Sequence, residues 1–230
     1  MKLAFKLFAV LCLCGAALAQ TTYSNLDDAS GWQSCSSCTG GGTAKYVFQQ
    51  LSNAAFSRDG KAIKLGISGG SAWSHVLAYK TVAPTTSTIR HFIDDVWLLM
   101  DKPANANGFS IAGHQTIGGK HYRFSTQCSF LKGVWSVWDT HNGHWLTTSA
   151  PCTRPLPLTW RHVVIETERT TDSREHFISF TVDGRQSIVN KYVYPESGSG
   201  ASVGVHIEAD ANGQAAPFNI YWDQFSFKTW

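Results

Sequence analysis

The feature that most limits the fold of this chain is the alternation of apolar and polar residues, which recurs in short runs along the sequence. In the clearest run, three apolar residues alternate with three polar ones: Val203, Val205 and Ile207 with His206, Glu208 and Asp210. A period of two is that of a β-strand with one buried face. No stretch of eleven or more residues shows a convincing helical period of about 3.6 residues. The chain is therefore predicted to be all-β.

Tight turns separate the runs, among them Gly118-Gly119, Asn142-Gly143 and Asp183-Gly184. About a dozen short strands joined by such turns predict a jelly-roll β-sandwich of two antiparallel sheets. Residues 20–230 show no repeat and no linker, and their number suits one domain. Residues 20–42 are rich in Ser, Thr, Gly and Cys and are predicted to form an irregular lead-in.

The first 19 residues have the three parts of a secretory signal peptide. Lys2 and Lys6 precede and flank an apolar run over residues 7–13, and Ala17-Leu18-Ala19 provides a small-residue end. We expect a secreted protein, extracellular or periplasmic, with no membrane span because no later apolar run reaches about 18 residues. The chain has 19 basic and 16 acidic residues, and two of the basic ones lie in the signal peptide, so the mature chain has a net charge of 19 − 2 − 16 = +1. With so little positive charge, nucleic acid is not an expected partner. The protein is also predicted to be a monomer.

Four cysteines remain after the signal peptide: Cys35, Cys38, Cys128 and Cys152. They allow three pairings. In an oxidising compartment the simplest joins Cys35 to Cys38 and Cys128 to Cys152. Redox chemistry or half of a zinc site is the alternative for Cys35-x-x-Cys38. The absence of a βαβ pattern and of a second such motif in the sequence argues against it.

Residues 128–152 contain the densest tryptophan cluster and read as a β-hairpin. Asn142-Gly143 suits a two-residue type I′ turn, which would place Trp138 opposite Thr147 and Thr140 opposite Trp145. On this register Trp138 and Trp145 share a face with hydroxyl side chains, as a sugar-stacking platform would. The alternative is that the disulfide loop or a neighbouring sheet covers both indoles.

Residues 108–115 and 120–128 form a second predicted hairpin around Gly118-Gly119. One face is apolar and is expected in the core. The other is polar and includes His114, His121, Arg123 and Gln127. Such a face is either solvent-facing sheet or the floor of a cleft.

Three motifs resemble, in their order, those of concanavalin A-like (laminin-G-like) jelly rolls: Trp160-x-His162, Phe180-x-Val182-Asp183-Gly184 and Trp222-Asp223-x-Phe225. Further segments look like a largely uncharacterised family of exported bacterial proteins of this fold: His91 to Asp95, Ser125 to Cys128, Val137 to Thr140, and Cys152. The resemblance implies the jelly roll, export and a carbohydrate ligand.

The primary expectation is a protein that binds polysaccharide on the concave sheet, with contacts from Trp138, Trp145, His114, His206 and Glu208. Aromatic faces stack on sugar C–H patches, while sugar hydroxyls need paired donors and acceptors. A second alternative is a non-catalytic envelope or adhesion protein without a glycan ligand.

A polysaccharide lyase acting on an acidic glycan is the first alternative. β-Elimination from a uronic acid needs a group that neutralises the carboxylate and a base that removes a proton. His121, Arg123 and Gln127 could supply both, together with His114. A retaining glycoside hydrolase of this fold would carry E-x-D-x-x-E on one strand, and residues 208–213 lack the final acid.

No cofactor is predicted. His206, Glu208 and Asp210 share one strand face and could bind a metal of mixed nitrogen and oxygen preference. The resemblance adds that calcium is a common structural ion in this superfamily, for which Asp27, Asp28 or Asp223 are the candidate ligands.

Overall fold

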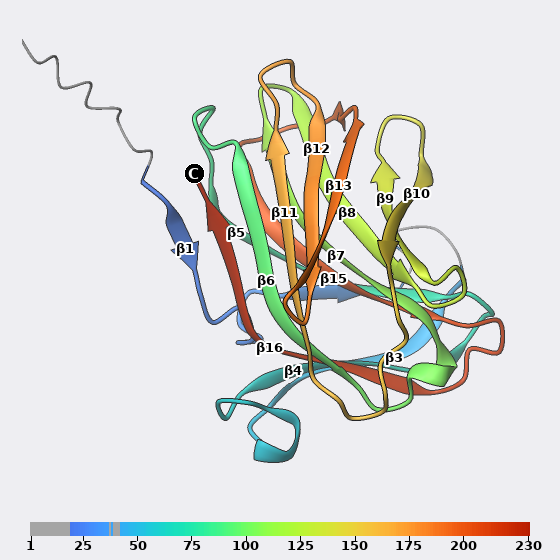
Figure 1. Cartoon of the computed structure of the whole chain (residues 1–230). Helices are drawn as coiled ribbons and strands as arrows, with labels where there is room; N and C mark the ends of the chain where they lie inside the picture. Colours follow the sequence, from blue (N-terminus) through green and yellow to red (C-terminus); the bar gives the residue numbers. More distant parts are fainter. Residues whose placement is uncertain (1–18, 37, 39–41) are drawn as a thin grey trace, which may run out of the picture.

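The structure is a computed structural model that describes residues 19–36, 38 and 42–230. The signal-peptide prediction falls almost entirely outside the described residues. Two antiparallel sheets of eight strands each pack face to face, as the sequence predicts for a jelly-roll sandwich. Figure 1 shows β11 (Arg161–Arg169) and β12 (Glu175–Val182) of one sheet in front of β7 (Ala106–Ile117) and β8 (Lys120–Ser129) of the other.

The sheets are here called sheet A and sheet B. Sheet A has the order β13 (Arg185–Val193), β12, β11, β6 (His91–Met100), β16 (Phe218–Thr229), β4 (Ala62–Gly70) and β3 (Ala44–Leu51), with β1 (Thr21–Tyr23) also on β16. Sheet B has the order β10 (His144–Pro151), β9 (Val134–Asp139), β8, β7, β15 (Ser202–Ala211), β5 (His75–Pro84) and β2 (Gln33–Cys35), with β14 (Glu196–Ser197) also on β8. The helical elements among the described residues are two short 3-10 turns, η1 (Ala54–Phe56) and η2 (Pro103–Asn105). None of the described helices is long and apolar enough to cross a membrane.

The core lies between the sheets because every long strand turns one of its two faces inward. Its largest fully buried side chains are aromatic and come from both sheets: Trp135, Trp222, Phe92, Phe124, Phe177 and Phe180. Burying a side chain of this kind stabilises the fold by roughly 1.5–3 kcal/mol. Most inward-facing side chains therefore pack in the core, and the polar side chains of the strands lie mainly on the outward faces.

The predicted irregular lead-in is wrong in part, because residues 20–42 contain β1 and β2. Trp32, between these strands, is 8% exposed and packs with its ring 5.3 Å from that of Trp222. Its Nε1 donates a hydrogen bond to the carbonyl oxygen of Leu26 at 3.1 Å. Leu26, which is 3% exposed, and Trp32 thus anchor the segment to the core. β1 pairs with β16 of sheet A, and β2 adds to the edge of sheet B beside β5.

The hairpin of β9 and β10 has the predicted faces but not the predicted turn. Trp138 pairs with Trp145 and Asp139 with His144, so the loop has four residues instead of two. The Asp139 carboxylate accepts hydrogen bonds from the backbone N–H of Asn142 at 3.1 Å and from its side-chain amide at 2.8 Å. Gly143 alone of the Asn-Gly pair has a positive φ, +67°. The register moves by two residues, and a shift of two returns every side chain to its predicted face.

The second hairpin and both disulfides are as predicted. Ile117 pairs with Lys120 across Gly118-Gly119, and both glycines have positive φ. The Cys35–Cys38 disulfide lies where the chain leaves β2. The Cys128–Cys152 disulfide joins β8 to the segment after β10. It therefore closes the hairpin that carries Trp138 and Trp145.

Candidate functional site

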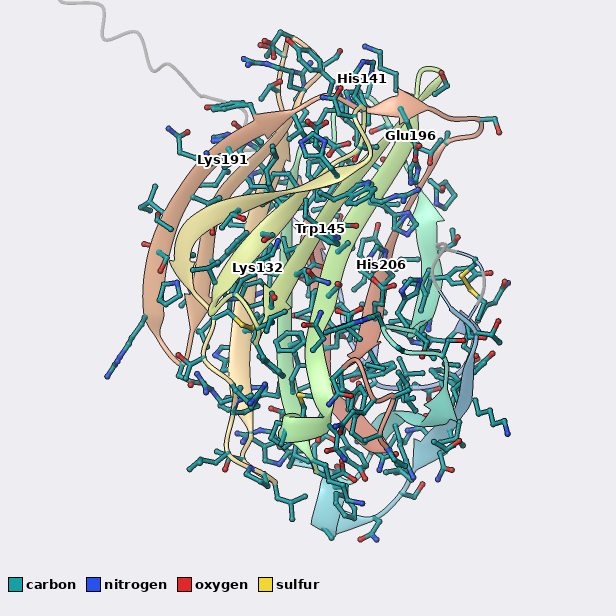
Figure 2. All side chains as sticks on the ribbon, turned by 90° about the vertical axis from the view of Figure 1, so that its right-hand side faces the viewer. Lys132, His141, Trp145, Lys191, Glu196 and His206 are labelled. Atoms are coloured by element: carbon teal, nitrogen blue, oxygen red, sulfur yellow. A yellow bond between two sulfur atoms is a disulfide. The ribbon has the colours of Figure 1, made fainter. Side chains whose placement is uncertain are left out.

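A cleft of about 400 Å³ lies on the outward face of sheet B. Figure 2 looks toward this sheet and labels Trp145 and His206, which both line the cleft. The cleft crosses six strands, and its wall is completed by Cys38. Its side chains are Cys38, His75, Leu77, Tyr79, His114, His121, Arg123, Ser125, Gln127, Trp138, Trp145, His206, Glu208 and Asp210.

All eight side chains that the sequence predicts for glycan contact or catalysis line this one cleft. They come from five strands that lie side by side in sheet B, in the order β10, β9, β8, β7 and β15. The sequence did not single out His75, Leu77 and Tyr79, which β5 contributes. Their spacing of two residues was the available signal, but nothing local shows that β5 lies beside β15.

The register between β5 and β15 brings opposed side chains together. His206 lies opposite Tyr79, Glu208 opposite Leu77, and Asp210 opposite His75. Opposed residues point to the same side of a sheet. The polar half of the β15 alternation therefore meets the outward-facing side chains of β5, which are two polar aromatic residues and Leu77, on the cleft floor.

The two indoles form a corner. The ring centroids of Trp138 and Trp145 are 5.1 Å apart and their planes meet at 66°. Both side chains are half-buried, so neither the disulfide loop nor a neighbouring sheet covers them. The two indoles that the sequence predicts as a sugar-stacking platform thus present two faces at an angle, which suits a ligand that is contacted on two sides.

Three histidines occupy the middle of the cleft. The rings of His114 and His121 meet edge to face at 5.7 Å, and His121 Nδ1 lies 2.7 Å from Thr116 Oγ1. His206 Nε2 lies 3.3 Å from Ser125 Oγ. Gly204 makes room for the His114 ring, since a Cβ at that position would come within 2.3 Å of His114 Nε2.

Burial keeps these histidines uncharged. It lowers the pKa of His114 to about 3, with smaller effects from the charges of His121 and Arg123. Burial likewise holds the pKa of His206 well below its usual value, and the nearby His114 adds to the effect. The pKa of His121 is lowered by burial and by Arg123. Each ring at neutral pH therefore has one donor nitrogen and one acceptor nitrogen.

Two carboxyl groups of β15 face the same space. Burial, and to a smaller extent the negative charge of Glu208, raise the pKa of Asp210 to about 8. Gln127 Nε2 donates a hydrogen bond to Asp210 Oδ2 at 3.0 Å. His75 Nε2 lies 3.8 Å from Glu208 Oε1. At neutral pH Asp210 therefore presents a carboxylic acid, which both donates and accepts hydrogen bonds.

Arg123 is the cation of the cleft, and it has an acidic neighbour. Its Nη2 donates to Glu196 Oε1 of β14 at 2.8 Å. Its backbone N–H donates to Glu175 Oε1 at 2.9 Å, and Thr140 Oγ1 donates to the other oxygen at 3.2 Å. Glu175 belongs to β12, so this carboxyl group links sheet A to the strand that carries Arg123. Burial raises the pKa of Glu175 well above its usual value.

The metal-binding hypothesis for β15 changes in one member. The ligand atoms of His75, Glu208 and Asp210 lie within 4.8 Å of one another, so His75 takes the place expected for His206. Asp210 holds a proton at neutral pH and accepts from Gln127. We interpret this group as part of the hydrogen-bonding surface of the cleft.

A second acidic group lies outside the cleft. Asp27 and Asp223 have ligand atoms within 4.8 Å of those of Asp59. Asp28, expected from the sequence, instead accepts from the backbone N–H of Ser30 at 2.9 Å and pairs with Lys61 at 3.6 Å. Asp223 is 0% exposed, and its Oδ1 has no hydrogen-bond partner in the described part of the chain.

No family model and no curated protein matches the chain. Among solved structures it is similar to arcelin-5, a lectin-like defence protein from Phaseolus vulgaris, with a TM-score of 0.50 and 12% identity over 92% of this chain and 98% of that one. It is also similar to a family 11 carbohydrate-binding module from Clostridium thermocellum in complex with a β-1,3-1,4-linked tetrasaccharide (TM-score 0.43, 14% identity, 92% and 96% covered). Alginate lyase vAL-1 from Chlorella virus has a TM-score of 0.46 and 13% identity, with 87% and 93% covered.

These comparisons establish the fold of the chain. The chain has the concanavalin A-like jelly-roll fold, as the sequence motifs implied. At such identities the likeness reaches no further than the fold, because this architecture hosts many functions. The resemblance to an exported bacterial family stays a prediction.

Proposed function

We propose that the protein binds carbohydrate in the cleft of sheet B. The observation that carries this proposal is the combination, on one open sheet face, of two angled indoles with a row of uncharged groups that both donate and accept hydrogen bonds. A sugar ring has the matching chemistry. Its C–H groups form apolar patches that stack on aromatic faces, and each hydroxyl both donates and accepts.

The charges favour a neutral or weakly charged glycan. Burial keeps His114, His121 and His206 uncharged and Asp210 protonated at neutral pH. Arg123 is paired with Glu196. A strongly acidic polysaccharide would therefore meet little net positive charge, whereas a neutral one would lose no charge–solvent interactions on binding.

The indoles provide the direct test of this proposal. After a carbohydrate microarray has identified a bound polysaccharide, we expect Trp138→Ala and Trp145→Ala each to weaken its binding roughly tenfold, the equivalent of about 1.4 kcal/mol of lost stacking. Affinity electrophoresis in gels that contain this polysaccharide would measure the change.

Trp73→Ala is the matched control, because Trp73 is 53% exposed and does not line the cleft. We expect its binding to equal that of the wild type. Unchanged binding in both cleft variants would contradict the proposed site. Retention on no glycan of the array would contradict carbohydrate binding altogether and favour an envelope or adhesion role.

A polysaccharide lyase is the second candidate, and one observation favours it. His121 has a lowered pKa and lies in the same cleft as Arg123 and Gln127. An uncharged imidazole can accept the proton that β-elimination removes, while the guanidinium and the amide would neutralise the uronate. Under this hypothesis His121 is the base and the other two residues bind the carboxylate.

Elimination leaves a double bond in the product, which absorbs ultraviolet light. Incubation with alginate and with polygalacturonate, followed by absorbance, separates a lyase from a binder. A lyase would produce a steady rise that His121→Ala abolishes. Retention of these polymers without any rise would leave binding as the function.

We further propose that the protein works outside the cytoplasm, as a monomer. The two disulfides support this compartment, because such bonds persist where the surroundings are oxidising. The predicted signal peptide would be removed after Ala19. Amino-terminal sequencing of the exported protein should then begin at Gln20.

Calcium is proposed as a structural ion at Asp27, Asp59 and Asp223. Oxygen ligands suit this hard cation, and the partnerless Oδ1 of buried Asp223 is an acceptor that it would satisfy. Burial, together with the charges of Asp59 and Asp223, raises the pKa of Asp27 to about 6. A cation would relieve this repulsion.

Removal of calcium with a chelator is therefore expected to destabilise the protein. At a free calcium concentration of a hundred times Kd, binding adds about 2.7 kcal/mol to the free energy of unfolding, or on the order of 5–10 °C in Tm. Thermal unfolding of chelated protein with and without added calcium would measure this shift. Asp59→Asn, at an exposed position, should reduce the shift, and equal Tm values in both conditions would contradict calcium binding.

A further inference from the structure

A second cavity, here called the inter-sheet cavity, lies between the two sheets on the side away from the cleft. Its volume is about 140 Å³. Sheet A contributes residues of β6, β11, β12 and β13, and sheet B contributes residues of β7 to β10. The walls are largely apolar, with Phe109, Trp135 and Phe180 as their aromatic members and the Cys128–Cys152 disulfide at the base. It shares no lining residue with the cleft.

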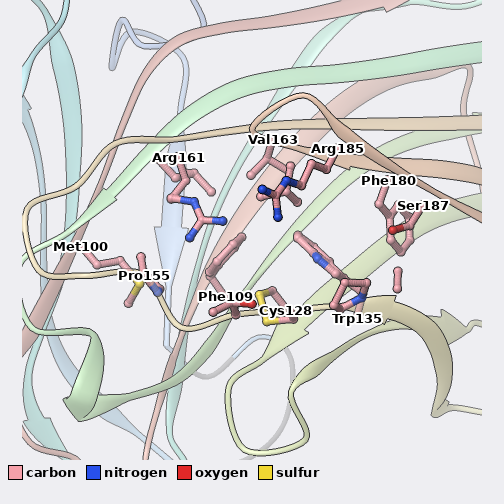
Figure 3. Close-up of a pocket in the computed structure, with 16 residues that line it drawn as sticks. Met100, Phe109, Cys128, Trp135, Pro155, Arg161, Val163, Phe180, Arg185 and Ser187 are labelled. Atoms are coloured by element: carbon pink, nitrogen blue, oxygen red, sulfur yellow. A yellow bond between two sulfur atoms is a disulfide. The ribbon is translucent and has the colours of Figure 1, made fainter.

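Two arginines are placed on this apolar space. Arg161 stands two residues before Val163 on β11, so both side chains start from the same face of the strand. Figure 3 shows the guanidinium groups of Arg161 and Arg185 directed into the space above the disulfide. Arg161 Nε lies 2.5 Å from Asp183 Oδ2, whereas Arg185 has no ion pair among the described residues. The mouth therefore carries a net positive charge.

A polar group without a partner lies in the opposite wall. The side chain of Trp135 is 1% exposed, and its Nε1 has no hydrogen-bond partner within the described ranges. A buried donor left in this state costs roughly 1–3 kcal/mol. An oxygen atom of a ligand in the cavity would satisfy it, so the wall has a place for one polar atom.

We propose that the inter-sheet cavity binds a small aromatic carboxylate. The volume is close to that of a cavity that holds benzene, about 150 Å³, and the aromatic walls suit a ring of that size. The guanidinium groups match a carboxylate, which they bind through two parallel hydrogen bonds. A sugar does not fit this space, since its many hydroxyls would face apolar walls without partners.

Benzoate is the probe for this site. Isothermal titration calorimetry of the whole mature protein should show saturable binding of one benzoate per chain. Benzyl alcohol has the ring without the charge, and acetate has the charge without the ring. We expect both to bind at least tenfold more weakly than benzoate, because each lacks one of the two features that the cavity recognises.

Two variants test whether benzoate binds in the inter-sheet cavity. Arg185→Gln removes an exposed cation of its mouth and should weaken binding roughly tenfold. Ala150→Leu adds volume at a lining position and should abolish binding. Arg154→Gln is the matched control, because the Arg154 guanidinium lies over the Phe130 ring and does not line the cavity. We expect it to change benzoate affinity less than twofold.

Each outcome decides for or against the cavity. Equal losses in Arg185→Gln and Arg154→Gln would show that benzoate senses only the general charge, which overturns the proposal. Absence of saturable binding, or binding retained in folded Ala150→Leu, would overturn it too. If Ala150→Leu does not fold, the comparison of the two arginine variants is sufficient. Trp138→Ala should leave benzoate binding unchanged, so this test is independent of the proposed glycan site.

Discussion

Asp94→Asn is expected to stabilise the protein increasingly as the pH rises. The Asp94 side chain is 0% exposed and belongs to the core-facing side of β6, between Phe92 and Val96. It reaches toward β7, where a Cβ on Gly113 would lie 3.1 Å from Asp94 Oδ2. Burial raises the pKa of Asp94 to about 8, and the backbone of Gly113 opposes this only in part.

The sign follows from proton binding. Between the ordinary pKa of 3.8 and the folded value of about 8, the folded state keeps a proton that the unfolded state has released. Stability contributed by Asp94 is therefore complete below pH 4 and is lost as the pH rises toward 8, at about 1.4 kcal/mol per pH unit. Asparagine has nearly the same shape and no such proton, so the loss disappears.

Urea unfolding of both proteins at pH 5 and pH 8 would measure this effect. The variant should gain on the order of 4 kcal/mol relative to the wild type over these three units. His206 and Asp210 titrate in both proteins and cancel in the difference. A difference that is the same at both pH values would show that Asp94 is not a protonated core carboxyl group.

Loss of the Cys128–Cys152 disulfide is the second change with a large expected effect. The two cysteines are 24 residues apart, and closing a loop of that length stabilises by about 3.5 kcal/mol in the chain-entropy model. Replacement of both cysteines by alanine should lower the free energy of unfolding by that order. It should also open the base of the inter-sheet cavity, since both cysteines line it.

The Cys35–Cys38 disulfide provides the comparison. Its cysteines are three residues apart, for which the same model gives about 2 kcal/mol. Denaturant unfolding of the two double-alanine variants should therefore rank them in this order. A larger loss from the Cys35/Cys38 variant would mean that the N-terminal segment, and not the length of the closed loop, determines the stability.

Much of the cleft was predictable because strand faces are a local property. Alternation placed His206 and Glu208 on one side of β15, and two hairpins placed His121, Arg123 and Trp138 on defined faces. The predicted turn between β9 and β10 was wrong, but the predicted strand faces were still correct because an error of two residues in register leaves every side chain on the same face. The burial of Asp94 was harder to predict from the sequence. Its parity with Phe92 placed it on the core side, but a charged residue type argues against burial.

The sequence by itself determined the strands, their inward and outward faces and the simplest cysteine pairing, because these depend on neighbours along the chain. Only the tertiary structure decided that β15 lies between β5 and β7, which adds His75 and Tyr79 to the cleft. It also decided the protonation of His114, Asp210 and Asp94, because burial depends on contacts made across the two sheets. Strand order and desolvation arise from pairings between distant segments, and a local pattern does not contain them.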